Sequence, residues 1–308
     1  MSSQPGIELA PAPAVHYLTL RLKAPAQAKP LLRLFAAMAA DEGVIVGFGA
    51  PLVNALGGCI AGLRPFPALE RPGGSVPTTQ GDVWVCTRGA DAGEALDRVL
   101  TIARGLPGGL EFVEDQPAFT YRGGRDLSGY EDGTENPKGA DAAAAAFVAE
   151  GPLAGSSFCA AQRWIHDLDA LARMPLAAQH AAMGRDRDTN VELADAPPSA
   201  HVKRAAQESF NPAAFMLRRS TPYGTAREHG LYFVAFGADL DRFERVMRRM
   251  VGEEDGVVDG LFGFSRPATG GYYWCPAVKE GRLDLTPMLP AGGIDAIPDV
   301  EVPLPTPA

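Results

Sequence analysis

The sequence predicts an α+β protein built from a duplicated βαβ-type unit with antiparallel sheets, one copy in each half of the chain. Short β-rich segments alternate with amphipathic helical segments, the same order returns in the second half, and an Ala/Gly-rich connection over 138–152, predicted to be partly helical, separates the two copies. Because 308 residues exceed the usual length of one compact domain, we expect two domains, over 1–150 and 151–308.

In the first half, the spacing of apolar residues predicts each element. Residues 16–22 carry leucine at every second position from Leu18, which predicts a strand. A helix is expected from about Pro30 to Ala40, because Pro30 suits a first turn, apolar residues recur at helical spacing and Gly43 follows as a stop. The remaining elements of this half are strands over 44–48 and 82–86 and an amphipathic helix over 91–104.

The second half repeats this order. Its predicted elements are strands over 157–164, 215–218, 231–236 and 272–275 and helices over 168–172, 176–183 and 239–251. In the last of these helices Phe243, Val246, Met247 and Met250 share one face, which indicates a helix packed on a core.

Composition excludes several classes of function. With 28 Lys+Arg against 37 Asp+Glu the net charge is −9, which disfavours binding to nucleic acid or to an anionic membrane.

The first residues lack a basic segment and an apolar stretch, so we expect a cytoplasmic protein. The Pro-rich ends, residues 1–14 and 298–308, are expected to be surface-laid or disordered tails.

The four cysteines are widely separated and form neither a CxxC nor a CxxCH sequence. They are therefore expected to be structural thiols rather than ligands or attachment points for a covalent haem.

Five histidines limit the candidates for a metal ligand. His201 follows a Pro-Pro-Ser-Ala segment and is expected to be presented from a loop, where ligands usually lie, although residue types alone leave a structural role open. Of the others, His16 and His180 are expected to be core or surface residues, His166 to help cap a helix, and His229 to lie solvated in a turn. No HxH or HExxH pattern favours zinc.

The segment 126–137 contains two glycines, Gly129 and Gly133, that flank a pair of carboxylates. Glycines allow a backbone to approach a ligand closely, so this loop is expected to direct Asp132 into a site. A Gly/Asp-rich turn or a calcium loop is the alternative, but the spacing departs from the EF-hand pattern.

Two adjacent arginines, Arg218 and Arg219, leave a predicted strand before a Pro-Tyr-Gly turn. Neighbouring strand residues point to opposite faces, so only one of the two can enter a given pocket. Residue types alone do not distinguish a site arginine from two solvated ones.

Several segments together resemble the dye-decolourising peroxidases. Residues 129–137, GYEDGTENP, resemble the family's GxxDG motif in the extended form of its compact bacterial class B. The other matching segments, in the family's order, are Trp164–Leu168, Ala200–Val202, Leu217–Gly224 and Asp259–Tyr273. The resemblance covers nearly the whole chain apart from its tails.

This resemblance implies a fold and a set of site residues. The family fold is a pair of ferredoxin-like domains with antiparallel sheets, of the dimeric α/β barrel superfamily type. By the same resemblance, each chain holds one non-covalent haem b with His201 as the iron ligand, Asp132 as the distal carboxylate and Arg218 as the distal arginine. Asp259 is our candidate for the carboxylate that accepts a hydrogen bond from the ligand imidazole. The remaining expected haem-contacting residues are Gly133, Thr134 and Ser220, the last at a position where some members carry Asn.

The implied activity is reduction of hydrogen peroxide and oxidation of dyes, phenols or other aromatic donors through a ferryl intermediate. Because the implied pocket is tight, bulky donors are expected to give up electrons at the haem edge or at the surface. Trp84, Trp164 and Trp274 are candidate relays, with core packing as the alternative. The family suggests a homo-oligomer, and the C-terminal tail shows no clear peptide for entry into an encapsulating shell.

Two other functions remain open from the sequence. One is a haem carrier or iron-releasing protein without physiological peroxidase turnover. The other is a cofactor-free ferredoxin-like binding module in which Asp132 and Arg218 form a structural salt bridge.

Overall fold

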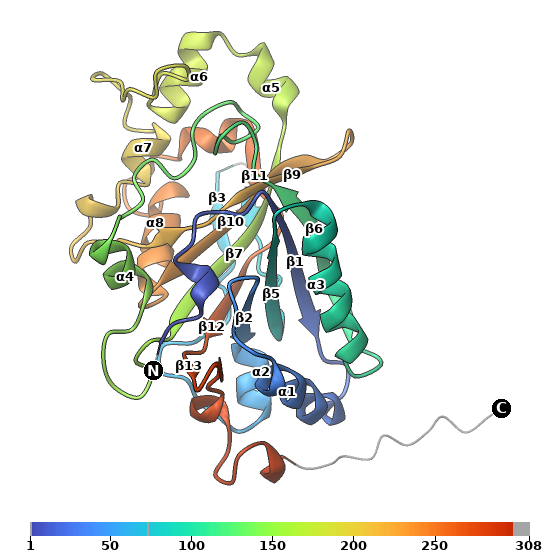
Figure 1. Cartoon of the computed structure of the whole chain (residues 1–308). Helices are drawn as coiled ribbons and strands as arrows, with labels where there is room; N and C mark the ends of the chain where they lie inside the picture. Colours follow the sequence, from blue (N-terminus) through green and yellow to red (C-terminus); the bar gives the residue numbers. More distant parts are fainter. Residues whose placement is uncertain (1, 73, 298–308) are drawn as a thin grey trace, which may run out of the picture.

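One antiparallel sheet of ten strands extends through both halves of the chain (Figure 1). The structure is a computed structural model, and it describes residues 2–72 and 74–297. The main path of the sheet has the order β6-β1-β5-β2-β12-β7-β10-β8, with β11 paired to β7 and β9 paired to β10.

The strands and helices have these bounds. The sheet contains β1 (Ala14–Arg21), β2 (Val44–Gly49), β5 (Val83–Gly89), β6 (Glu111–Phe119), β7 (Ser157–His166), β8 (Leu217–Arg218), β9 (Thr221–Gly224), β10 (His229–Gly237), β11 (Ser265–Pro267) and β12 (Gly271–Cys275). Two small hairpins are β3 (Leu69–Arg71) with β4 (Gly74–Val76) and β13 (Val278–Lys279) with β14 (Arg282–Leu283). The helices are α1 (Ala28–Ala37), α2 (Ala50–Ala55), α3 (Ala92–Gly105), α4 (Ala140–Ala146), α5 (Leu168–Arg173), α6 (Leu176–Met183), α7 (His201–Arg204) and α8 (Asp241–Met250).

The two halves share one topology. In the first half, chain order is β1, α1, β2, β5, α3, β6, and in the sheet the fourth strand lies beside the first, then the third, then the second. The second half gives the same order with β12, β7, β10 and β8. This is the ferredoxin-like βαββαβ arrangement, so the predicted α+β fold with antiparallel sheets is confirmed. The domain boundary near residue 150 stays a prediction.

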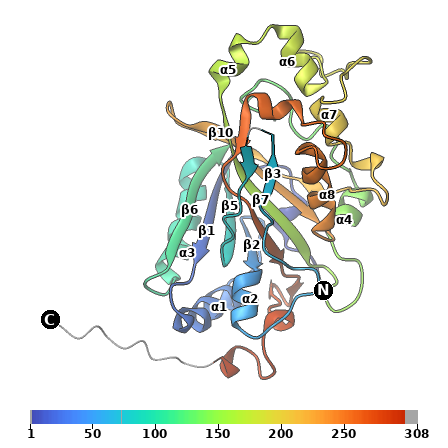
Figure 2. The same cartoon turned by 180° about the vertical axis from the view of Figure 1, so that it is seen from behind.

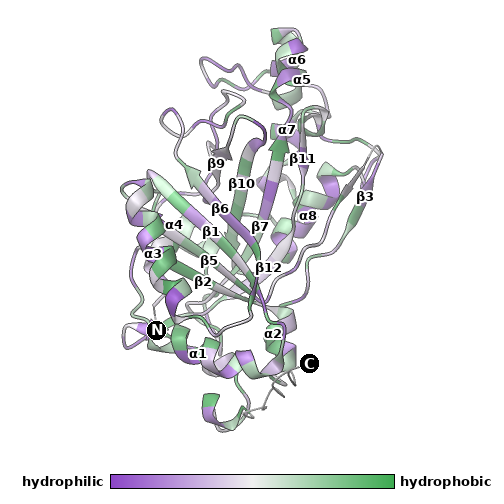
Figure 3. Ribbon diagram, turned by 90° about the vertical axis from the view of Figure 1, so that its right-hand side faces the viewer, coloured by the Kyte–Doolittle hydropathy of each residue, from purple (hydrophilic) through white to green (hydrophobic). Residues whose placement is uncertain are grey.

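The halves join edge to edge within the sheet. Tyr273 of β12 pairs with Gly49 of β2, and Trp274 pairs with Phe48. Helices α5 and α6 stand at one end of the molecule and α1 and α2 at the other (Figures 1 and 2). Hydrophobic colour follows the central strands, whereas the loops around α6 are mostly hydrophilic (Figure 3).

Two predictions about the first forty residues were wrong in part. Helix α1 ends at Ala37 rather than near residue 40, because Met38 is extended and the chain turns so that Ala39 forms a bridge with Arg282. The segment 2–14 is not a loose tail, since Ile7 is buried in a core cluster and the Gln4 side chain is hydrogen bonded to both N–H and C=O of Val46. The predicted C-terminal tail, 298–308, lies outside the described residues.

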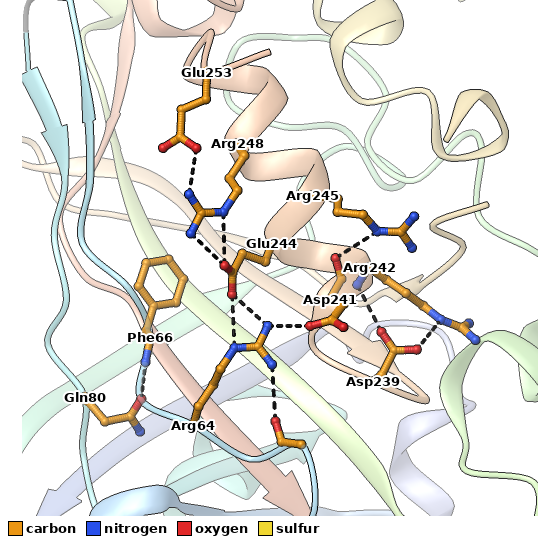
Figure 4. Close-up of polar contacts among 11 residues, drawn as sticks. Arg64, Phe66, Gln80, Asp239, Asp241, Arg242, Glu244, Arg245, Arg248 and Glu253 are labelled. Atoms are coloured by element: carbon orange, nitrogen blue, oxygen red, sulfur yellow. Dashed lines mark hydrogen bonds and ion pairs between the residues drawn. The ribbon is translucent and has the colours of Figure 1, made fainter. Parts of the chain in front are cut away.

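An ion-pair ladder ties α8 to a loop of the first half (Figure 4). Arg64 donates to Asp241 at 2.7 Å and to Glu244 at 2.7 Å, and Glu244 also accepts from Arg248. Arg248 in turn pairs with Glu253. Since α8 forms one wall of the cavity described below, this ladder connects that wall to residues outside its own half.

Along two neighbouring strands, β7 and β10, successive side chains alternate between a cavity on one face of the sheet and the buried core on the other. On β10, Leu231 and Phe233 face the cavity, whereas Tyr232 and Val234 lie in a buried cluster on the other face. Strand β7 alternates in the same way, with three cavity-facing residues, Gln162, Trp164 and His166.

Candidate active site

A cavity of about 520 Å³ lies between this face of the sheet and helices α7 and α8. Its volume falls within the range of about 300–1,000 Å³ typical of cofactor and ligand sites. Apolar side chains form most of its walls: Met216, Leu231, Phe233, Phe243, Val246, Met247, Met250 and Leu261. Polar residues converge on it from the loop 126–135, from α7 and from β8.

His201 enters the cavity as the first residue of α7, not from a loop as its sequence context predicted. Its Nδ1 lies 2.9 Å from Oδ2 of Asp259, which is buried, while the other Asp259 oxygen accepts from the N–H of Leu261. An ionised carboxylate only accepts hydrogen bonds, so Nδ1 carries the proton and Nε2 is left as the coordinating atom. Burial acts to lower the pKa of His201, but the Asp259 carboxylate more than offsets it, and the net shift is upward.

Asp132 reaches the cavity from a loop that two left-handed glycines shape. Gly129 has φ of 91° and Gly133 has φ of 73°, a region that other residues rarely adopt. The Asp132 N–H donates to the carbonyl of Gly124 at 3.1 Å, which fixes the turn. Its carboxyl group faces the cavity, and desolvation by the surrounding protein atoms raises its pKa. Arg218 opposes that shift and Asp126 adds to it.

Arg218 and Arg219 point to opposite faces, as strand alternation predicts. Arg218 ends β8 and lines the cavity, where its Nε is buried without a hydrogen-bond partner. Arg219 instead donates to the carbonyl oxygens of Ile7 and Glu8. Of these two arginines, Arg218 is therefore the one that can act on a molecule inside the cavity.

A residue whose role the sequence did not reveal holds the loop against the strand. Asn136 accepts from the N–H of Arg218 at 2.8 Å and donates to the Arg218 carbonyl at 3.0 Å. This two-way clamp fixes the loop of Asp132 relative to β8. The Asn-Pro pair predicted a turn, but its partner strand is 82 residues away in the chain and could not be predicted.

The other predicted haem-contacting residues divide into two groups. Gly133 and Thr134 line the cavity. The structure does not bring Ser220 there: it is absent from the cavity lining, and its Oγ accepts from the N–H of Val234 at 3.4 Å. Among the tryptophans, Trp164 lines the cavity, whereas Trp84 and Trp274 are buried in the core.

His166 was assigned the wrong role. The cap of α5 is its neighbour Asp167, whose side chain accepts from the N–H of Ala170 at 2.7 Å. His166 ends β7 inside the cavity and contacts Asp126 and Ser265, two cavity residues that were not predicted as site residues. The alternation of Gln162, Trp164 and His166 was the available sequence signal for this placement.

The chemistry of the cavity fits a haem. A single imidazole nitrogen is free to bind iron, and apolar walls suit a macrocycle. The guanidinium of Arg218 has an orphaned buried nitrogen, which indicates that the cavity receives a polar ligand. Among the described residues no ion pair joins Asp132 to Arg218, so the structural salt bridge of the cofactor-free alternative is not present.

Comparison with known proteins gives the family. Residues 123–280 match the family model described as Dyp-type peroxidase, C-terminal. A dye-decolorizing peroxidase of Mycolicibacterium paratuberculosis is 30% identical over 246 residues, covering 77% of this chain and 69% of that protein. The chain belongs to the Dyp-type peroxidase family. It is therefore a peroxidase, and the carrier and cofactor-free alternatives are not favoured.

Solved structures of family members share the fold of this chain. A dye-decolorizing protein from V. cholerae has a TM-score of 0.80 and 31% identity, covering 89% of this chain and 97% of that one. DyPB from Rhodococcus jostii has a TM-score of 0.81 and 26% identity, covering 89% and 95%. A DypB variant in complex with heme has a TM-score of 0.77 and 28% identity, covering 87% and 94%.

Within residues 2–72 and 74–297, none of the helices has the length and apolar character that crossing a lipid bilayer requires.

Proposed function

We propose that this member of the family binds one haem b non-covalently in the 520 Å³ cavity, with His201 as the iron ligand, and that Asp132 and Arg218 activate hydrogen peroxide there. The observation that carries the proposal is the convergence of these three side chains on one apolar cavity. They come from α7, from the loop 126–137 and from β8.

Asp259 acts on the iron ligand His201. Its carboxylate accepts the Nδ1 hydrogen of His201 and thereby orients the ring and makes Nε2 more electron-donating. When bound, the haem supplies an iron that holds peroxide and accepts its two oxidising equivalents. Electron donation from a carboxylate-bonded imidazole favours cleavage of the O–O bond.

Asp132 moves the proton. In its ionised form the carboxylate takes the proton from the inner oxygen of peroxide and delivers it to the outer oxygen, which leaves as water. The raised pKa of Asp132 makes its carboxylate a better proton acceptor than that of an ordinary aspartate.

Arg218 stabilises the charge that develops on the leaving oxygen. Its guanidinium is always protonated, and no side chain among the described residues occupies its buried Nε. A donor preorganised in this way costs no rearrangement at the moment of reaction.

The electron donors in this proposal are dyes, phenols and other small aromatic compounds. Bulky donors give up electrons at the haem edge or through the protein, with Trp164 as the tryptophan that borders the cavity. We further propose that the protein works in the cytoplasm and that it is a homo-oligomer, the latter as the family resemblance suggests.

Replacement of His201 tests the haem assignment. His201→Ala is expected to abolish binding of haem with an ordinary histidine-ligated ferric spectrum, measured by haem content and absorption after haem-supplied expression. His229→Ala is the matched control, because His229 begins β10 outside the cavity. An unchanged ferric spectrum in His201→Ala would remove His201 as the ligand.

A further inference from the structure

Three polar side chains form a hydrogen-bonded series along the cavity, separate from the residues used above. Nδ1 of His166 lies 2.7 Å from Oγ of Ser265, and its Nε2 lies 3.0 Å from Oδ1 of Asp126. All three residues line the cavity. A carboxylate, an imidazole and a hydroxyl therefore stand in sequence and border the same cavity as Asp132 and Arg218.

The series is rigidly held. Ser265 of β11 lies directly opposite His166 of β7 in the strand register. The second oxygen of Asp126 accepts from the N–H of Ser128 at 2.9 Å. Burial acts to raise the pKa of Asp126, but His166 and Ser128 together outweigh it, and the pKa is lowered overall. Asp126 is thus an ionised acceptor that balances positive charge on His166 whenever the ring holds a second proton.

The reaction needs a source of protons. Reduction of one hydrogen peroxide to two waters consumes two electrons and two further protons, because both protons of peroxide itself leave in the first water. When a bulky donor is oxidised outside the cavity, its electrons enter but the protons it releases do not. Protons must then reach the cavity by a separate route.

We propose that Asp126, His166 and Ser265 form a proton relay that supplies these protons. The step begins with a ring that holds a proton on each nitrogen: the Nδ1 proton passes to Oγ of Ser265 as the Ser265 hydroxyl proton passes into the cavity. This leaves a neutral ring whose Nε2–H donates to the Asp126 carboxylate. The ring then regains its second proton from water that enters on the side of Asp126, whose side chain is 13% exposed whereas that of His166 is 3% exposed, and the Ser265 hydroxyl turns back. The relay ends each cycle unchanged, and the electrons come from the aromatic donor.

The surroundings of the relay carry both signs of charge. Asp132, Arg218 and His201 face the same cavity from three other elements, and the ring of Phe264 packs edge-on against His166. The remaining titratable or charged groups at the cavity are Tyr130, Glu131, Glu135, Arg185, Glu192, Lys203 and Glu208. Among all the described titratable or charged groups that line the cavity, Asp126 alone is hydrogen bonded to His166.

The relay rests on the proposed function, so its test separates two steps of the haem-loaded enzyme. Stopped-flow absorption would follow the spectral change on adding peroxide, and then the return to the resting spectrum on adding a bulky dye. In His166→Gln we expect the return to slow by about 10²-fold, the scale of lost acid–base catalysis, with much less change in the peroxide step. Added imidazole should restore the return rate.

A second variant and a matched control keep the result interpretable. Ser265→Ala removes the hydroxyl that passes the proton into the cavity but leaves the His166–Asp126 pair. It should slow the return to the resting spectrum by a similar factor. His16→Gln is the control, because His16 is a buried histidine paired with Asp115 away from the cavity, and should return at the wild-type rate. Return rates within about twofold of wild type in both cavity variants, or equal slowing in the control, would overturn the relay.

A readout without haem tests the geometry. In the haem-free protein, a ring N–H resonance lost in His166→Gln should also be lost or shifted in Asp126→Asn and in Ser265→Ala. A His166 resonance insensitive to both partners would contradict the hydrogen-bonded series. A wild-type protein that shows no spectral change with peroxide would instead refute the proposed function itself, which distinguishes the two failures.

Discussion

At the scale of single residues, Asp132 combines two requirements that oppose each other. In the proposed mechanism its carboxyl must face the cavity, where desolvation disfavours its charge, yet it must be ionised to accept a proton. Burial and the neighbouring Asp126 raise its pKa, while Arg218 lowers it. The balance leaves the pKa of Asp132 above that of an ordinary aspartate, so the carboxylate is expected to be protonated, and unable to accept a proton, at low pH.

The pH dependence of Asp132 is therefore predictable. As the pH falls through the raised pKa of Asp132, the carboxylate is protonated and can no longer accept a proton from peroxide. The rate of the peroxide step should therefore begin to fall at a pH above about 3.9, which is the pKa of free aspartate. Asp132→Asn should lower the rate across neutral pH and remove this acid limb. Asp97→Asn is the matched control, because Asp97 is exposed on α3 outside the cavity. An acid limb that survives in Asp132→Asn would assign it to another group.

The adjacent arginines offer an internal comparison. Arg218→Ala should slow the spectral change with peroxide by about 10² or more, since one preorganised donor is commonly worth that. Arg219→Ala, which changes the same residue type one position along and outside the cavity, should react within about twofold of wild type. Stopped-flow rates would rank the two, and equal losses would mean that stability, not the cavity, explains the effect.

At the scale of elements, the site depends on how a loop is held against a strand. Asn136 fills both backbone hydrogen bonds of Arg218, so it positions Arg218 and Asp132 together without facing the reaction itself.

Asn136→Ala should therefore reduce kcat for peroxide turnover while leaving haem content near wild type. Asn136→Asp, which keeps the acceptor but not the donor, should recover part of the loss. Asn54→Ala on the exposed face of α2 is the control. Steady-state kinetics would check this, and a loss confined to haem content would show that Asn136 holds the cofactor rather than the geometry.

Elements with strong periodicity could be predicted from the sequence, and weakly patterned ones could not. The strands β1, β5 and β10 and the helices α3 and α8 follow apolar spacing. Strand β6 has charged residues and Pro117 in place of a clear alternation, because it lies at the edge of the sheet. The site was found through motifs, whereas the contacts of Asn136 and His166 depend on distant pairings that one sequence does not encode locally.

At the scale of the whole molecule, the two halves share one sheet. The pairing of β2 with β12 and the ladder from Arg64 to α8 link them. We expect a single cooperative unfolding transition in calorimetry. Because haem binds only the folded state, it should raise the free energy of unfolding by about 4 kcal/mol at a free haem concentration 1,000-fold above Kd, and so raise the transition temperature. Two transitions, with haem shifting only one, would instead show two independent domains.

The central claim is that an imidazole from α7 holds iron opposite a carboxylate and a guanidinium that act on peroxide. The most direct measurement is the absorption spectrum of the haem-loaded protein before and after one equivalent of hydrogen peroxide, in the wild type and in Arg218→Ala. We predict a histidine-ligated ferric spectrum that changes rapidly in the wild type and at least about 10²-fold more slowly in the variant. A wild-type spectrum that peroxide leaves unchanged, or equal rates in both proteins, would contradict the account.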